Sequence, residues 1–188
     1  MIHILYLAAG QSRRYGSNKL LDDWNGKPLY RWGLDTIREA IRERDDCTLT
    51  VVTCWQEIQS ALEEEEIRTA DCPDSHLGVS YTIRAGIRSL GSLLEEDYLC
   101  FAVADQPNLT PETIDRLLDT AKTHPLTACL ASGEFSGNPV LFSEVLAEEL
   151  CALEGDCGGK AVMRRHPENH LDVPCDPAEL EDIDVKAK

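Results

Sequence analysis

The most constraining feature of this chain is an apolar segment that changes abruptly into a small-residue, glycine-containing loop. Residues 2–7 read IHILYL, which has the length and composition of a buried parallel strand. Residues 8–10 read Ala-Ala-Gly, and a second glycine follows at Gly16. Small residues let a backbone come close to a ligand, and glycine reaches backbone angles that other residues resist. The pattern predicts a strand followed by a loop that can approach a ligand.

The same loop carries positive charge. Arg13, Arg14 and Lys19 fall close together in a chain whose formal net charge is −16. Converging loop N–H groups and nearby cations form a site for a polyphosphate. The alternative is an ordinary strand-to-helix connection with solvated basic residues. We favour a phosphate site, because three cations fall within seven positions of a chain that is otherwise strongly acidic.

Two familiar phosphate loops do not match this segment. A P-loop requires Gly-Lys followed by Ser or Thr, whereas Lys19 lies between Asn18 and Leu20. The dinucleotide fingerprint requires glycines spaced as G-x-G-x-x-G, and Gly10 and Gly16 do not have that spacing.

The segment does resemble the LAAGxSxRxGxxKLL signature of the MobA-like nucleotidyltransferases, particularly the molybdenum cofactor cytidylyltransferases. The matching positions are Leu7, Ala8, Ala9, Gly10, Ser12, Arg14, Gly16, Lys19, Leu20 and Leu21. Later segments resemble the family in the same order: GKPLYRW, HLGVSYTIRAGI, GNPVLF, GDCGGK and EDID. The chain departs from the family at Gly159, where alanine is usual, and after Asp184, where Thr-Pro is missing.

Strand and helix signals alternate along the chain. Strands are predicted at residues 48–54, 98–104, 126–131 and near 171–173, and helices at 28–44, 57–66, 79–90, 111–122 and 143–150. Thr110 and Ser143 are the expected N-caps of the last two helices. This alternation predicts a three-layer α/β/α, Rossmann-like domain spanning residues 1–188, with a mostly parallel sheet and right-handed crossovers. The resemblance implies the nucleotidyltransferase version of that fold.

Asp105 ends the strand predicted at residues 98–104. Ligands of such sheets bind outside the carboxyl ends of the strands, so we expect Gly10 and Asp105 to share one crevice. A carboxylate in this position suits Mg²⁺, which prefers oxygen ligands. The alternative is an aspartate that caps the turn before Pro107.

The resemblance implies a role for particular residues. It implies that the nucleotide is bound by Leu7, Ala8, Ala9, Gly10, Arg14, Lys19, Gly78 and Ser80. Arg14, Lys19 and Asp105 are the implied catalytic residues, Asp105 and Asp184 the metal ligands, and Asn138 and Asp156 the acceptor-binding residues. Ser80 has an alternative role in starting a helix.

Charge and cysteine usage limit the other partners. Strong acidity disfavours nucleic acid and anionic membranes. The eight cysteines are scattered with no C-x-x-C pair, so we expect cytosolic thiols packed as small hydrophobic residues, with a zinc or iron–sulfur site as the alternative. The five histidines show no clustering, and none is nominated for the site. No secretory or membrane-spanning segment is evident, so we expect a cytoplasmic protein.

The resemblance, together with these features, implies a magnesium-dependent cytidylyltransferase. It would transfer a cytidylyl group from CTP to molybdopterin, release pyrophosphate, and pass the product to a molybdoenzyme or its chaperone. One alternative keeps the reaction but changes the base or acceptor, as in guanylyl transfer or a sugar- or alcohol-phosphate acceptor. Another is a non-catalytic nucleotide- or cofactor-binding protein that delivers its ligand.

Overall fold

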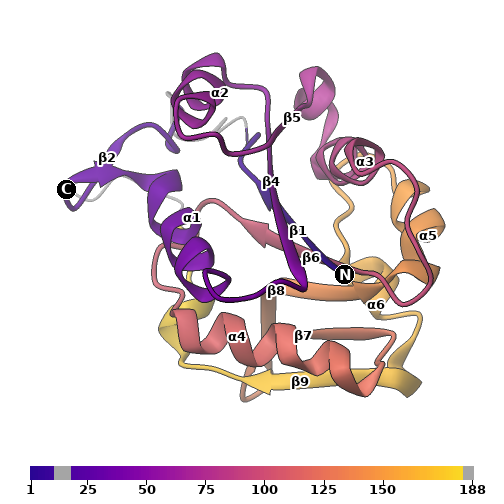
Figure 1. The fold of residues 1–188 in the computed structure, drawn as a ribbon. Coiled ribbons are helices and arrows are strands. Elements are labelled where there is room, and N and C mark those ends of the chain that lie inside the picture. Colours follow the sequence, from indigo (N-terminus) through magenta and orange to yellow (C-terminus); the bar gives the residue numbers. More distant parts are fainter. Residues whose placement is uncertain (11–17, 184–188) are drawn as a thin grey trace.

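A central seven-stranded sheet organises the molecule (Figure 1). The computed structural model describes residues 1–10 and 18–183. The strand order is β5-β4-β1-β6-β8-β7-β9, and β8 runs antiparallel to both of its neighbours while the other pairs are parallel. The strands are β1 (Ile2–Leu7), β4 (Cys47–Thr53), β5 (Thr69–Asp71), β6 (Tyr98–Val103), β7 (Thr127–Ser132), β8 (Phe135–Ser143) and β9 (His170–Pro174). A separate hairpin pairs β2 (Asp23–Trp24) with β3 (Lys27–Pro28). The predicted mostly parallel sheet is confirmed.

Helices cover both faces of this sheet (Figure 1). One apolar cluster contains side chains of α1, α2 and α4, and a second contains side chains of α3, α5 and α6. The helices are α1 (Leu29–Ala40), α2 (Gln56–Glu63), α3 (Val79–Ser89), α4 (Pro111–Asp119), α5 (Ala147–Cys151) and α6 (Lys160–Met163). Short 3₁₀ turns lie at η1 (Pro73–Leu77), η2 (Thr120–Thr123), η3 (Glu144–Leu146), η4 (Pro167–Asn169) and η5 (Pro177–Leu180). The three-layer prediction is therefore confirmed.

Strand β1 lies in the middle and contributes to both layers. Ile4 and Tyr6 pack into the cluster that contains α1, whereas Leu5 and Leu7 pack into the cluster that contains α3. Successive side chains of a strand point to opposite faces, so a strand covered on both sides must be apolar throughout. This is why the first segment of the sequence is apolar except at the half-buried His3.

Several predicted boundaries were wrong. The helix expected over residues 28–44 begins after Pro28 and ends at Ala40, and that expected over residues 111–122 becomes 3₁₀ after Asp119. The helix expected over residues 143–150 does not start at a Ser143 cap: β8 continues to Ser143, and the Ser143 hydroxyl donates to Glu144. Strand β5 and the reversed strand β8 were not predicted.

The cysteines are all free thiols. Cys72, Cys100 and Cys129 are buried, Cys157 is exposed, and the others are half-buried. Burial raises the pKa of the Cys100 thiol, which keeps it protonated and unreactive. The expectation of thiols packed as small hydrophobic residues therefore fits the buried ones and does not fit Cys157.

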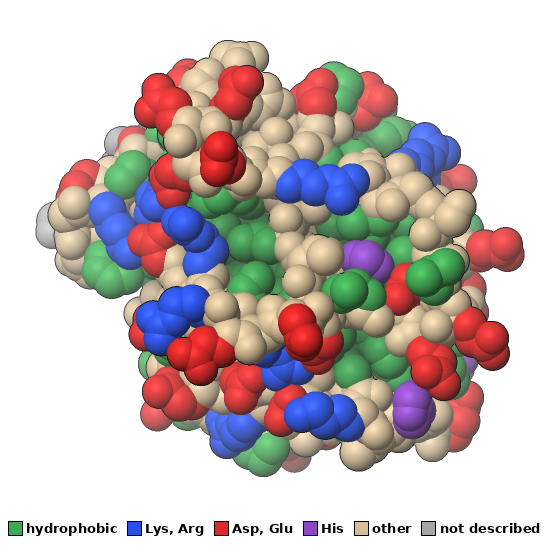
Figure 2. All heavy atoms as spheres, viewed as in Figure 1, with side chains coloured by type: hydrophobic (Ala, Val, Ile, Leu, Met, Phe, Trp, Pro, Cys, Tyr) green, Lys and Arg blue, Asp and Glu red, His purple; other side chains and the backbone are tan. Residues whose placement is uncertain are grey.

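Acidic side chains are distributed over the surface. Figure 2 shows them over several elements of one face, with lysine and arginine side chains among them. Among the residues that the structure describes, no helix is both long enough and apolar enough to cross a membrane.

A buried carboxylate fastens the C-terminal segment to α4. Glu179, 5% exposed, accepts hydrogen bonds from the Thr110 N–H (3.0 Å), the Thr110 hydroxyl (2.8 Å), the Thr113 hydroxyl (3.1 Å) and the Asp176 N–H (3.0 Å). Thr110 also caps α4 as predicted, because its hydroxyl oxygen accepts from the Thr113 N–H.

Replacing this carboxylate should destabilise the protein. Glu179→Ala leaves several buried donors without an acceptor, so the free energy of unfolding should fall by roughly 2–4 kcal/mol. Urea unfolding followed by circular dichroism measures the change. Glu95→Ala, at an exposed position, is the control and should have little effect. Equal stability of the two variants would contradict the anchoring role.

Candidate functional site

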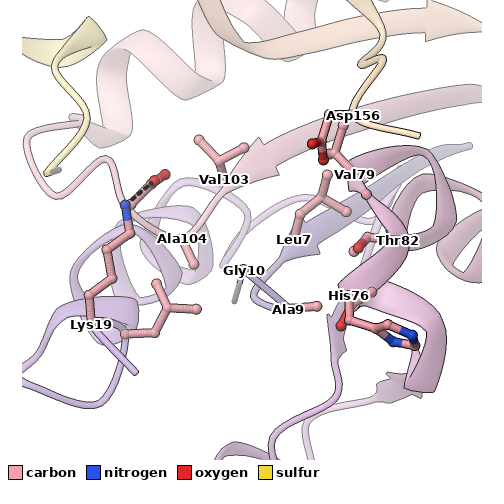
Figure 3. A pocket seen from close by; sticks show the side chains of 14 residues that line it. Leu7, Ala9, Gly10, Lys19, His76, Val79, Thr82, Val103, Ala104 and Asp156 are labelled. Atoms are coloured by element: carbon pink, nitrogen blue, oxygen red, sulfur yellow. Dashed lines mark hydrogen bonds and ion pairs between the residues drawn. The ribbon is translucent and has the colours of Figure 1, made fainter. Parts of the chain in front are cut away.

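The candidate site is a cavity at the carboxyl ends of β1 and β6. It has a volume of about 280 Å³ and is lined by Leu7, Ala9 and Gly10 after β1 and by Val103, Ala104 and Asp105 after β6 (Figure 3). The two strands pair in register, with Leu7 beside Val103. Both loops therefore leave the sheet at the same place, as expected for this class of sheet.

Lys19 and Asp105 form an ion pair in this cavity. The Lys19 Nζ lies 2.8 Å from Asp105 Oδ2 and 2.8 Å from the Ile183 carbonyl oxygen. The two side chains are 12% and 24% exposed, so they are partly shielded while still facing the cavity. Residues 86 positions apart in the chain thus place opposite charges at one point.

The loop after β1 is hydrogen-bonded to β4 on one side and borders the cavity on the other. The Ala8 N–H donates to the Val52 carbonyl (2.8 Å), and the Ala8 carbonyl accepts from the Thr53 hydroxyl (2.8 Å). Ala8 is fully buried, whereas Gly10 is exposed at the cavity. A Cβ built on Gly10 would meet no described atom within 4 Å. Residues 1–10 and 18–183 therefore leave space beside this backbone for a ligand.

The opposite wall comes from the start of α3 and the residues before it. Figure 3 shows Val79, Thr82 and His76 across the cavity from Lys19. Gly78 has φ +131°, and a Cβ there would lie 2.2 Å from the Gly155 backbone. Only glycine allows the 155–156 turn to pack so closely against α3.

Ser80 is placed differently from the other predicted residues. It is fully buried, and its backbone N–H donates to the Gly155 carbonyl (3.1 Å). Its hydroxyl has no hydrogen-bond partner among the described residues and makes no capping bond for α3. Ser80 lies behind the cavity rather than along it, and its nucleotide-binding role stays a prediction.

The two predicted acceptor residues lie in different cavities. Asp156 is exposed on the rim of the first cavity. Asn138 lines a second cavity of about 770 Å³, together with Gln106, Lys160 and Asp182. Because Asp105 faces the first cavity and Gln106 the second, the two cavities flank the segment that follows β6.

The C-terminal segment packs against the residues that follow β6, between the two cavities. The Ile183 N–H donates to the Asp105 carbonyl (2.9 Å), and the Gln106 side-chain amide donates to Asp182 Oδ1 (2.9 Å). Arg14 and Asp184 lie outside the described residues, so their predicted roles stay predictions.

Sequence reasoning missed part of the lining. Ser75, His76, Val79 and Thr82 also face the cavity. The HLGVSYTIRAGI segment pointed to this region, but only the packing of η1 and α3 shows which side chains turn inward.

The donor set suits a hard divalent cation. Asp105 offers a partly exposed carboxylate in the cavity, and Mg²⁺ commonly binds one or two carboxylates together with substrate phosphates. In the structure this carboxylate is paired with the Lys19 ammonium.

The fold and the position of the cavity define a three-layer α/β protein of the nucleotide-binding type. The chain belongs to the MobA-like NTP transferase domain family, whose model matches residues 4–170. Nucleotidyl transfer is the activity of this family.

Two curated proteins are similar to the chain. The Purine catabolism protein PucB of Bacillus subtilis is 27% identical over 96% of this chain and 90% of its own length. A Molybdenum cofactor guanylyltransferase of Shewanella putrefaciens is 25% identical over 74% of this chain and 67% of its own length.

Solved structures show the same fold. A nucleotidyl transferase from Methanothermobacter has a TM-score of 0.79 and 23% identity, covering 98% of this chain and 92% of its own. Rv0371c of Mycobacterium tuberculosis, in a complex with manganese, has a TM-score of 0.68 and 22% identity, covering 93% of this chain and 89% of its own.

Alanine substitutions at two glycines of the site should have different effects on the free energy of unfolding. Gly78→Ala forces a Cβ into the Gly155 backbone and should lower the free energy of unfolding by about 1–3 kcal/mol. Gly10→Ala meets open space and should change stability by less than about 0.5 kcal/mol.

Ligand binding should also distinguish the two glycine variants. Gly10→Ala should weaken nucleoside triphosphate binding, because its methyl group fills the space beside the loop backbone. Thermal unfolding and calorimetric titration check both outcomes. A stable Gly78→Ala protein, or unchanged triphosphate affinity in Gly10→Ala, would contradict this description of the cavity.

Proposed function

We propose that this protein transfers a cytidylyl group from CTP to molybdopterin with the help of Mg²⁺ and releases pyrophosphate. The observation that carries the proposal is the Lys19–Asp105 pair inside the cavity beside Gly10. A triphosphate needs cationic groups and open backbone, and a metal ion needs a carboxylate. The cavity offers all three within reach of one another.

The residues have distinct parts in this reaction. A phosphate oxygen of the acceptor attacks the α-phosphorus of the nucleotide, and the bond to pyrophosphate breaks. The backbone of residues 8–10 and Arg14 would hold the triphosphate, and Lys19 would stabilise the charge that develops on the leaving pyrophosphate. An ionised phosphate monoester needs no general base, so this mechanism assigns no step to His76, although His76 lines the cavity.

Asp105, with Asp184 as the second carboxylate, would hold the metal ion. The ion would neutralise charge on the phosphate oxygens. The manganese complex of the structurally similar Rv0371c supports a divalent cation in this fold. Because Lys19 already contacts Asp105, lysine and metal would share one carboxylate.

The second cavity is the proposed acceptor site. Its volume of about 770 Å³ suits a pterin-sized ligand, and Asn138 and Lys160 line it. Asp156 would contact the acceptor from the rim of the first cavity. A molybdoenzyme or its chaperone would receive the product.

Guanylyl transfer is the second candidate, favoured by the similarity to the Shewanella guanylyltransferase. A non-catalytic delivery protein would bind the same ligands without turnover. Measuring pyrophosphate release with molybdopterin and CTP, GTP or ATP separates the three. Release with none of these nucleotides would leave only the binding protein or another acceptor.

Asp105→Asn should abolish turnover and leave folding nearly intact. The change removes the metal-binding charge but little packing, and loss of such a group costs on the order of a hundredfold or more in rate. Pyrophosphate release at several Mg²⁺ concentrations measures it, and Asp45→Asn, at an exposed position, is the control. Substantial magnesium-dependent turnover in Asp105→Asn would overturn the assignment.

Lys19→Ala and Arg14→Ala should weaken binding of CTP more than binding of CMP. Their proposed partners are the β- and γ-phosphates, which CMP lacks. Lys122→Ala replaces a lysine that is 68% exposed and serves as the control. Equal losses for CTP and CMP would assign these residues to another part of the nucleotide.

CTP should be preferred over GTP by about 10- to 200-fold, and Ala9→Gly should relax the preference. Ala9 is 2% exposed and lines the cavity, so its methyl group narrows the space that a purine needs. Turnover at matched nucleotide concentrations measures the ratio. Equal use of GTP by the unmodified protein would reject the cytidylyl assignment and retain nucleotidyl transfer.

A further inference from the structure

A cluster of potential metal ligands lies on β7 and β9, at the β9 edge of the sheet. Cys129 Sγ is 3.7 Å from His170 Nε2 and 3.6 Å from Asp172 Oδ1, and the last two atoms are 3.1 Å apart. None of these residues lines the two cavities described above.

The sheet itself brings the three side chains together. Strands β7 and β9 are parallel neighbours, with Thr127 beside His170 and Cys129 beside Asp172. Alternate residues of a strand share a face, so two residues from each strand converge on one side. Cys129 belongs to the apolar cluster that contains α6, which identifies that side.

The arrangement differs from a catalytic relay. In a nucleophile–histidine–acid relay, the nucleophile and the acid contact opposite nitrogens of the ring. Here Cys129 and Asp172 both face Nε2, while Nδ1 lies 2.8 Å from the Thr127 hydroxyl. Three potential ligand atoms thus surround one point, and Thr127 fixes the ring that supplies one of them.

The separations match a tetrahedral ion. Zn²⁺ binds sulfur at about 2.3 Å and nitrogen or oxygen at about 2.0–2.2 Å, so neighbouring tetrahedral ligands lie roughly 3.3–3.6 Å apart. The observed separations of 3.7, 3.6 and 3.1 Å fall close to this range. Little movement is needed to place all three ligands around one ion.

We propose that Cys129, His170 and Asp172 bind Zn²⁺ or a similar borderline-soft divalent ion. A thiolate and an imidazole favour such ions over Mg²⁺. The Asp172 side chain is 64% exposed, which leaves room for water as the fourth ligand. Binding releases the Cys129 thiol proton to solvent and ties the edge strand β9 to β7.

Cobalt substitution tests the proposal on the full chain. Protein stripped with a chelator is titrated with Co²⁺ in excess Mg²⁺, which occupies the hard-ligand site near Asp105. We expect one Co²⁺ per chain, with a thiolate-to-cobalt charge-transfer band and the intense visible bands of tetrahedral Co²⁺. Displacement by Zn²⁺ should remove these bands and raise the unfolding temperature.

Variants identify the ligands. Cys129→Ser should lose the charge-transfer band, and Asp172→Asn should weaken Co²⁺ binding by at least about 100-fold. Thr127→Val should weaken binding by about 10- to 100-fold through loss of the ring contact. Cys157→Ser, which removes the exposed thiol, should bind as the unmodified protein does.

The proposal would be overturned if the unmodified protein shows no charge-transfer band. It would also be overturned if the band survives in Cys129→Ser or is lost in Cys157→Ser. Asp172 is exposed, so Asp172→Asn remains a test if Cys129→Ser does not fold. Unchanged Co²⁺ affinity in Asp172→Asn would exclude Asp172 as a ligand. The nucleotide assays are independent of these outcomes.

Discussion

The in-register pairing of β1 with β6 is the constraint on which the candidate site depends. Both strands are buried on two faces, so they are apolar except at the half-buried His3, and small or charged residues follow where they leave the sheet. Since they are parallel neighbours, they leave it at the same edge. Gly10 and Asp105, remote in sequence, therefore face one cavity. Burial of the strands thus fixes where binding chemistry can occur.

The lysine–aspartate pair connects this edge to the end of the described chain. Lys19 contacts both Asp105 and the Ile183 carbonyl, while Glu179 holds the adjoining η5 turn against α4. A charged pair in a partly shielded cavity gains from the lower local dielectric, and a ligand that carries several negative charges competes directly for the lysine. The site therefore combines groups from the start, middle and end of the sequence.

The reversal of β8 shapes the other half of the molecule. By running antiparallel between β6 and β7, β8 contributes Asn138 to a cavity beside Gln106. It also places β7 and the edge strand β9 beyond it, where Cys129, His170 and Asp172 meet. The Asp105 carboxylate thus lies at the carboxyl end of a central strand, whereas a mixed sulfur–nitrogen–oxygen set lies at the β9 edge of the sheet. The two places suit different cations.

The sequence by itself determined the three-layer class, the buried strands, the Thr110 cap and the family, because periodicity, capping and local motifs act over a few residues. Of the residues that the family resemblance nominated, seven line one cavity in the structure: Leu7, Ala9, Gly10, Lys19, Gly78, Asp105 and Asp156. Tertiary structure alone decided the direction of β8, the separation of Asn138 from Asp156, and the burial of Ser80. It alone joined Cys129 to His170 across 41 positions. Strand direction and side-chain convergence depend on pairing between distant segments, and no local pattern encodes that pairing.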